Sequence, residues 1–198
     1  TMIVFIINLE KNMNEKLTDE EKRILLSVAR ESIVCATRHE KLPQIQLEDY
    51  SKILQEDGAS FVTLHTKREK KLRGCIGSLE AYQPLILDVQ THAVGAALED
   101  YRFPPVRPDE VNLLQIEISR LTIPKPLNYS EPNQLPKLLN ARIDGIILND
   151  GFRRSTFLPQ VWEQLPDPEE FLDHLCAKMG AEPGLWRRKK LEVFTYEV

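Results

Sequence analysis

Two β-rich runs surround one turn in GIILNDGFRRSTFLP, residues 145–159, and this stretch decides the fold class. The dipeptide Asp150-Gly151 supplies the positive φ angles that a tight hairpin requires. A second hairpin joins FVTLH (61–65) to KLRGCIGSL (71–79) through the charged turn TKREKK. Because hairpins pair neighbouring strands, both stretches indicate antiparallel β-structure rather than βαβ units.

Helices separate and follow these hairpins. Thr18 and Glu21 form a capping box in front of an amphipathic helix of about twenty residues. A second helix is predicted from Pro84 to about Asp100, and a third over 167–180. Together with the hairpins they predict an α+β fold with a mainly antiparallel β-sheet flanked by helices.

Two further strands complete the predicted order of elements. LLQIEISRLTI (113–123) alternates apolar and polar residues up to Ile118 and then changes phase, which predicts a β-bulge near Ser119. A final strand, KKLEVFTYEV (189–198), closes the chain.

Composition places the chain among ordinary globular proteins, with 28% charged and 42% hydrophobic residues. The formal net charge of −4 argues against a dedicated nucleic-acid binder. The cysteines Cys35, Cys75 and Cys176 are far apart and form no metal-binding spacing, so we expect reduced thiols, a cytoplasmic location, no metal and no cofactor.

The apolar stretch MIVFIINL (2–9) is too short for a membrane span and lacks the features of a signal peptide. We therefore expect no membrane association. Residues 1–16 are interpreted as an N-terminal extension, with 1–12 either an upstream addition or a peripheral strand, and residues 17–198 as a single domain.

LRGCIG (72–77) is the segment with the clearest chemical potential. Strand periodicity places Arg73, Cys75 and Gly77 on one face, where the positive charge of Arg73 would favour the Cys75 thiolate. Cys75 and Arg73 are thus candidate catalytic residues, and a dyad of Cys75 with His65 is a further hypothesis. The alternative is a small buried cysteine, with the glycines serving a bulge.

Other polar residues carry two interpretations each. Asp100 and Arg102, followed by Phe103, either pair with each other or bind a ligand. Glu117 and Ser119 lie on the polar face of the 113–123 strand, which faces either solvent, the default, or a polar site.

The chain also carries two basic clusters, and both are interpreted as solvated surface, because no stacking aromatics interleave with the charges. Nucleic-acid binding remains the weaker alternative for them. The clusters are Lys67, Arg68, Lys70 and Lys71, and Arg187, Arg188, Lys189 and Lys190.

Four motifs in this order resemble the AMMECR family over about residues 17–198. They are LRGCIG at 72–77, the run that ends in DYRFPP at Pro105, IEIS at 116–119 and FLPQV at 157–161. The resemblance implies a compact α+β unit of two lobes, with a cleft between them lined by motif residues. In this sequence the implied cleft residues are Gly74, Gly77, Asp100, Arg102, Phe103, Glu117, Ser119 and Gln160.

The resemblance implies less about function. In prokaryotes the family resembles one member of a gene set with a Memo-like protein and a radical-SAM protein, which suggests a shared pathway or complex. We therefore expect an accessory or regulatory module that binds a peptide or small-molecule ligand. A cysteine-dependent enzyme acting on a small molecule through Cys75 is the alternative, and the sequence does not decide whether the chain is an enzyme.

Overall fold

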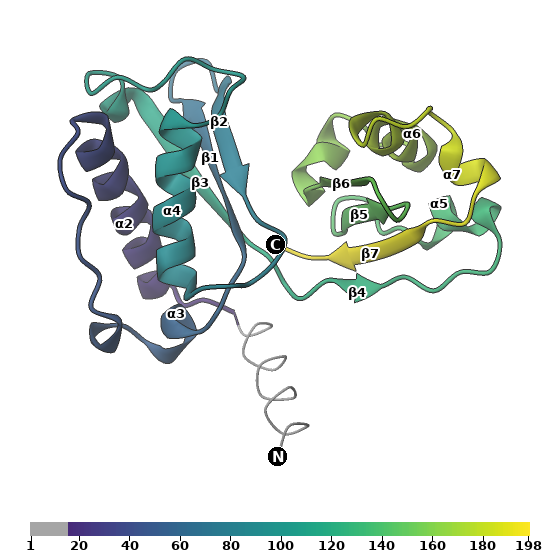
Figure 1. The fold of residues 1–198 in the computed structure, drawn as a ribbon, viewed down its shortest axis with the longest axis horizontal. Coiled ribbons are helices and arrows are strands. Elements are labelled where there is room, and N and C mark those ends of the chain that lie inside the picture. Colours follow the sequence, from purple (N-terminus) through teal and green to yellow (C-terminus); the bar gives the residue numbers. More distant parts are fainter. Residues whose placement is uncertain (1–15) are drawn as a thin grey trace. The chain divides into compact units, whose positions relative to one another are not determined.

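The computed structural model describes residues 16–198, and the chain divides into two compact units between Leu121 and Thr122. Each unit has its own antiparallel sheet, helices and hydrophobic core (Figure 1). The expected α+β class with antiparallel sheets and flanking helices is confirmed. The interpretation of residues 1–12 as an extension or a peripheral strand lies outside the described residues.

Unit 1 contains a three-stranded sheet in the order β2-β1-β3. Its strands are β1 (Ser60–Thr66), β2 (Leu72–Gly77) and β3 (Leu114–Arg120). All neighbours are antiparallel, so β1 forms the centre and β2 and β3 form the two edges. The hairpin predicted from residues 61–79 is thereby confirmed.

Two long helices cover one face of this sheet, α2 (Asp19–Thr37) and α4 (Leu85–Leu98) (Figure 1). The predicted capping box is present, since the Thr18 side chain accepts from the Glu21 N–H at 3.2 Å and the Glu21 carboxylate accepts from the Thr18 N–H at 2.8 Å. A short helix, α3 (Lys52–Gln55), and 3-10 turns at Leu47–Asp49 and Val111–Leu113 complete the unit.

The prediction of a β-bulge in the 113–123 strand is wrong. β1 and β3 pair without interruption from Ser60 opposite Arg120 to Thr66 opposite Leu114. The change of phase in the sequence instead marks the end of β3, where the Leu121 N–H donates to the Ala59 carbonyl. The strand stops at the boundary between the two units, and the following apolar residues belong to a new environment.

Unit 2 contains a four-stranded antiparallel sheet in the order β4-β7-β5-β6. Its strands are β4 (Lys125–Pro126), β5 (Gly145–Asn149), β6 (Arg154–Phe157) and β7 (Glu192–Tyr196). The predicted final strand is thus confirmed and lies inside the sheet, between β4 and β5.

The β5–β6 hairpin is confirmed, but its turn is longer than the Asp150-Gly151 dipeptide suggested. Asn149 pairs with Arg154, so residues 150–153 form the loop, closed by a hydrogen bond from the Asp150 N–H to the Arg153 carbonyl at 3.0 Å. Within this loop Gly151 alone has a positive φ, 92°.

The helices of unit 2 pack on its sheet around a stacked aromatic pair. They are α5 (Leu135–Leu138), α6 (Pro168–Lys178) and α7 (Leu185–Arg188), with 3-10 turns at Pro132–Gln134 and Pro159–Glu163. The rings of Trp162 and Phe171 lie 3.7 Å apart between centroids, and both side chains are buried. Every helix among residues 16–198 is too short or too polar to span a bilayer.

Candidate functional site

β2 is an edge strand, and side chains rather than another strand cover its outer edge at Cys75. The Cys75 N–H donates to Asp100 Oδ2 at 2.8 Å, and the Cys75 carbonyl accepts from Arg102 Nη2 at 3.3 Å. In an antiparallel pair the N–H and C=O of one residue point to the same side, so both groups face away from β1. Asp100 and Arg102 therefore take the place of the peptide groups of a further strand.

Asp100 is the centre of this arrangement. Arg102 donates to both of its carboxylate oxygens, from Nε at 2.8 Å and from Nη2 at 2.7 Å, and the Arg102 N–H adds a bond at 3.2 Å. The hydrogen bonds from the Arg102 side chain lower the pKa of Asp100 to about 2, against the opposing effect of burial, and the Cys75 N–H contributes in the same direction. Asp100 and Arg102 thus pair with each other, as one of the two interpretations proposed.

Arg73 binds the segment that follows Phe103. Its guanidinium donates to the Pro104 carbonyl at 2.7 Å and the Pro105 carbonyl at 3.3 Å, and Nη2 lies 3.2 Å from Glu110 Oε2. The Arg73 charge is therefore engaged with residues 104–110. This differs from the expected role beside the sulfur, because the guanidinium that contacts Cys75 is that of Arg102, through the backbone carbonyl.

The Cys75 thiol is half-buried and has a hydroxyl neighbour that belongs to no motif. Thr63 lies directly opposite Cys75 on β1, and its Oγ1 donates to Cys75 Sγ at 3.2 Å. His65 lies opposite Leu72 instead, beyond a register irregularity after Leu64, so the strand pairing does not support the Cys75–His65 dyad. Thr63 could have been found only from the pairing register, which the charged turn leaves undetermined in the sequence.

The remaining motif residues of unit 1 lie in rows across the sheet. One row joins Cys75, Thr63 and Glu117, and the next joins Gly77, Phe61 and Ser119. These residues alternate with the buried Val62 and Leu64, so they share the face opposite the helices. Ser119 is buried, with 5% of its surface exposed, so the default of a solvent-facing side chain is wrong at that position.

The two glycines of LRGCIG allow close packing. A Cβ atom at Gly74 would lie 2.0 Å from the Ala96 carbonyl oxygen of α4. One at Gly77 would lie 2.4 Å from both the Phe61 ring and the Ser60 carbonyl oxygen. Gly74 therefore brings α4 onto β2, and Gly77 accommodates β1.

Of the two remaining candidate residues, Phe103 adjoins this group and Gln160 does not. Phe103 is half-buried, its N–H donates to the Asp100 carbonyl at 3.0 Å, and the Arg102 guanidinium lies 5.5 Å from the centre of its ring. Gln160 belongs to unit 2, in the turn Pro159–Glu163, where it lines a pocket of about 630 Å³ together with Arg142, Trp162 and Glu163. Among residues 16–198, no group of three or more His, Cys, Asp or Glu side chains is arranged to hold a metal ion.

A model of the AMMECR1 family matches residues 26–198. The chain belongs to the AMMECR1 family. Protein MK0488 of Methanopyrus kandleri is 37% identical over 191 residues, covering 93% of this chain and 89% of the relative. Protein MJ0810 of Methanocaldococcus jannaschii is 37% identical over 155 residues, covering 78% of this chain and 77% of the relative.

A solved structure of another archaeal protein has the same fold. The crystal structure of the uncharacterised protein PH0010 from Pyrococcus horikoshii aligns with a TM-score of 0.85 at 32% identity, covering 92% of this chain and 91% of that one. The AMMECR1 assignment therefore gives a family and a fold.

Proposed function

We propose that this AMMECR1-family chain is an accessory binding module, whose partner contacts the turn 100–103 and the adjoining Cys75 region. The observation that carries the proposal is the exposure of Tyr101, 95%, on a turn that is otherwise rigidly held. The Asp100 carboxylate fixes both sides of Tyr101, because it accepts from Cys75 in β2 and from Arg102. Tyrosine and arginine are the residues most often found at the energetic centres of protein interfaces.

The chemistry of Asp100 favours binding over acid–base catalysis. A general acid or base works best with a pKa near the operating pH, whereas the pKa of Asp100 is about 2. Its carboxylate is also occupied by four hydrogen bonds from Cys75 and Arg102. The role that these contacts support is positioning: Asp100 holds Tyr101 and Arg102 in one conformation, which reduces the entropic cost of binding.

The resemblance suggests which partners to test first, a Memo-like protein and a radical-SAM protein. A peptide segment of either protein, or a small-molecule ligand of the same pathway, would fit a binding module. These partners are proposals that rest on the family resemblance alone.

The test compares Tyr101→Ala with Tyr82→Ala. Tyr82 is also exposed, 59%, but it precedes the N-terminal end of α4, whereas Tyr101 follows the C-terminal end of that helix. Affinity-tagged wild type and both variants are mixed with purified Memo-like and radical-SAM proteins, and bound protein is quantified. We expect Tyr101→Ala to weaken binding at least about tenfold and Tyr82→Ala to leave it unchanged.

A footprint then locates the contact. Iodoacetamide labelling of Cys75, in a Cys35→Ser, Cys176→Ser background, should slow when the partner is bound. Equal binding by wild type and Tyr101→Ala, or unchanged labelling of Cys75 in the complex, would contradict the proposed surface.

A cysteine-dependent enzyme is the second candidate, favoured by the Thr63 hydroxyl at 3.2 Å from the half-buried Cys75 sulfur. The pH dependence of alkylation separates the two functions. An apparent pKa well below ~8.5, lost in Arg102→Ala but kept in Arg73→Ala, would support an activated thiol. Labelling of Cys75 only after the protein unfolds would exclude the cysteine-dependent enzyme and favour the binding module.

A further inference from the structure

Three segments of unit 2 meet at one end of its sheet. The Leu127 N–H donates to the Val193 carbonyl at 2.8 Å, which places the chain after β4 beside the start of β7. On the other side of β7, Asn149 pairs with Glu192, which brings the β5–β6 loop alongside. Residues 128–130, 189–191 and 150–153 therefore lie next to one another, although they are far apart in the sequence.

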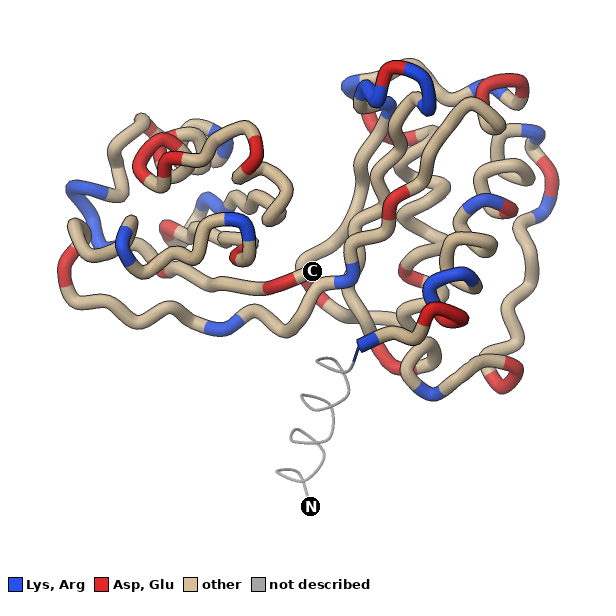
Figure 2. Tube along the Cα trace, turned by 180° about the vertical axis from the view of Figure 1, so that it is seen from behind, with Lys and Arg blue, Asp and Glu red and all other residues tan. Residues whose placement is uncertain are grey.

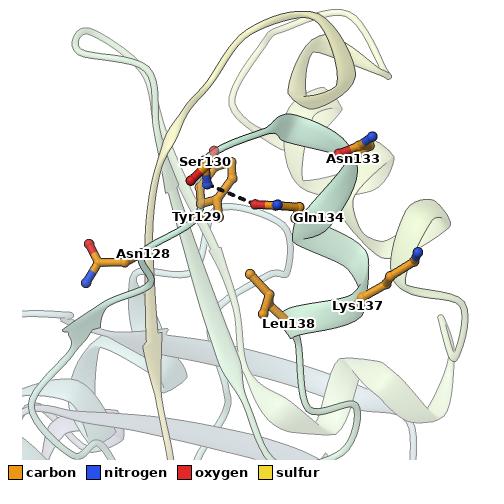
Figure 3. A pocket seen from close by; sticks show the side chains of 7 residues that line it. All are labelled: Asn128, Tyr129, Ser130, Asn133, Gln134, Lys137 and Leu138. Atoms are coloured by element: carbon orange, nitrogen blue, oxygen red, sulfur yellow. Dashed lines mark hydrogen bonds between the residues drawn. The ribbon is translucent and has the colours of Figure 1, made fainter.

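The first segment begins a pocket of about 660 Å³ that is lined by polar and apolar side chains (Figure 3). Three of its side chains carry amides, and a serine, a lysine, a leucine and a tyrosine complete it: Asn128, Asn133, Gln134, Ser130, Lys137, Leu138 and Tyr129. Gln134 is fixed, since its Oε1 accepts from the Ser130 N–H at 2.9 Å, the bond drawn in Figure 3.

Several polar groups of this pocket are available to a ligand. Within residues 16–198, the side chains of Asn128, Asn133 and Lys137 make none of the hydrogen bonds or ion pairs of the fold, and all three are exposed. Figure 3 shows Asn133 and Lys137 extending from the same side of their turn, as expected for positions four apart. An amide offers both a donor and an acceptor, and the lysine adds a positive charge.

Two lysines lie between this pocket and the β5–β6 loop. Lys190 Nζ lies 5.6 Å from the centre of the Tyr129 ring, at the pocket. Lys189, the preceding residue, lies on the other side, with Nζ 3.8 Å from Asp150 Oδ1 in the loop. Figure 2 shows the basic residues of this stretch in blue. Arg187 and Arg188 form closer ion pairs, at 2.6 to 3.0 Å, with other acidic side chains of unit 2.

The loop presents an aromatic ring beside these charges. Phe152 is fully exposed, 103%, between Gly151 and Arg153. The interpretation of the basic stretch as ordinary solvated surface rested on the lack of an interleaved aromatic. The fold supplies one from a distant part of the chain, since residues 150–153 lie alongside 189–191.

We propose that this end of the unit 2 sheet binds single-stranded nucleic acid. Phe152 offers a stacking face for a base, Lys137, Lys189 and Lys190 face the phosphates, and the amides of the pocket can pair with the edge of a second base. A duplex hides its base faces from Phe152. A lipid bilayer could receive Phe152 and the lysines, but it offers the amides no base edge that both donates and accepts.

The test is fluorescence anisotropy of the full chain with a labelled ten-nucleotide oligouridylate. We expect a dissociation constant on the order of 10 µM at 50 mM salt. With three phosphate contacts, the affinity should fall roughly 20-fold between 50 and 200 mM salt. Phe152→Ala should weaken binding about tenfold, and Lys189→Gln with Lys190→Gln should reduce both the affinity and its salt dependence.

Matched substitutions in unit 1 serve as controls. Tyr82→Ala removes another exposed aromatic, and Lys41→Gln with Lys52→Gln removes two other exposed lysines, so neither should change the affinity. Asn133→Asp should weaken binding severalfold, whereas Asn112→Asp, with the same change of charge, should not.

Three outcomes would overturn the proposal. The first is no change in anisotropy at 50 mM salt. The second is equal affinity for a ten-base-pair duplex, which would show attraction to phosphate alone. The third is binding of phosphatidylserine vesicles that depends on Phe152 while the oligonucleotide remains unbound, which would assign the surface to membranes.

Discussion

At the scale of single residues, Asp100 links the LRGCIG segment to DYRFPP. Its carboxylate bridges the Cys75 N–H of β2 and the Arg102 side chain of the next motif. It is 5% exposed and makes four charge-assisted hydrogen bonds, which are stronger than neutral ones. Removing its charge would leave the Arg102 guanidinium without its ionic partner and would weaken the hydrogen bond to the Cys75 N–H.

We predict that Asp100→Asn lowers the free energy of unfolding by about 1 to 2 kcal/mol at pH 7. The pKa of Asp100 falls from 3.8 to about 2 on folding, so the carboxylate stabilises the fold fully above about pH 4. This contribution is lost as the pH falls through 2, because the folded state must then be protonated as well. Urea unfolding should therefore show the same difference in the free energy of unfolding between wild type and variant at pH 7 and pH 5. At pH 3 this difference should be smaller.

Asp109→Asn is the matched control for this prediction. Asp109 pairs with Arg107 at 3.0 Å, but both side chains are largely exposed, so the pair adds little. A loss in Asp109→Asn as large as that in Asp100→Asn would contradict the special role of Asp100.

At the scale of elements, the close contact of α4 with β2 depends on one position. Gly74 faces the helix backbone, with the Ala96 carbonyl oxygen 2.0 Å from where a Cβ would be. A side chain there must push the whole helix away from the sheet, because a backbone carbonyl cannot move aside like a flexible side chain. Cys75 follows directly, so its position relative to Asp100 depends on the same contact.

We predict that Gly74→Ala destabilises unit 1 by roughly 3 kcal/mol or more, as measured by urea unfolding. Gly95→Ala, on the helix side of the same interface, should change stability by less than about 1 kcal/mol. There a Cβ would meet Ile76 Cγ2 at 3.2 Å, and the gain in helix propensity offsets the small shift of that side chain. Similar losses in both variants would show that the helix can move and that Gly74 is not decisive.

The sequence predicts these elements well because each has a local signal. The capping box of α2, the two hairpins and the final strand are all set by residues near one another in the chain. The β-bulge near Ser119 was wrong because a change of hydrophobic phase marks either a bulge or the end of a strand. Only the partner of the following segment distinguishes them, and β3 ends where the second unit begins.

The candidate site was harder to predict, because its contacts are between distant residues. The motifs contain Cys75, Asp100 and Arg102, which the fold brings together, but they do not indicate the direction in which Arg73 points. Thr63 has no motif, and its place beside Cys75 depends on the register of the hairpin. The alternation of apolar and polar residues fixes which face of a strand is buried, but a register shift of two residues keeps the same face.

At the scale of the whole molecule, the chain builds two separate hydrophobic cores. The core of unit 1 combines α2, α4 and the sheet, with Leu25, Ile33 and Val89 fully buried. That of unit 2 surrounds the stacked Trp162 and Phe171. The residues of each core come from one continuous part of the sequence, so each unit contains the apolar contacts that its own fold needs.

We therefore predict that core substitutions act within their own unit. Leu175→Ala, at a fully buried position of α6, should cost about 2 to 5 kcal/mol. In native-state hydrogen exchange it should reduce the protection of amides in β5 and β7 while leaving β1 near its wild-type protection. Leu25→Ala in α2 should reduce the protection of amides in β1 and leave β5 and β7 near their wild-type protection. An equal loss of protection in both units after either substitution would mean that the two cores unfold as one cooperative system, and the division at Leu121 would then describe geometry without describing stability.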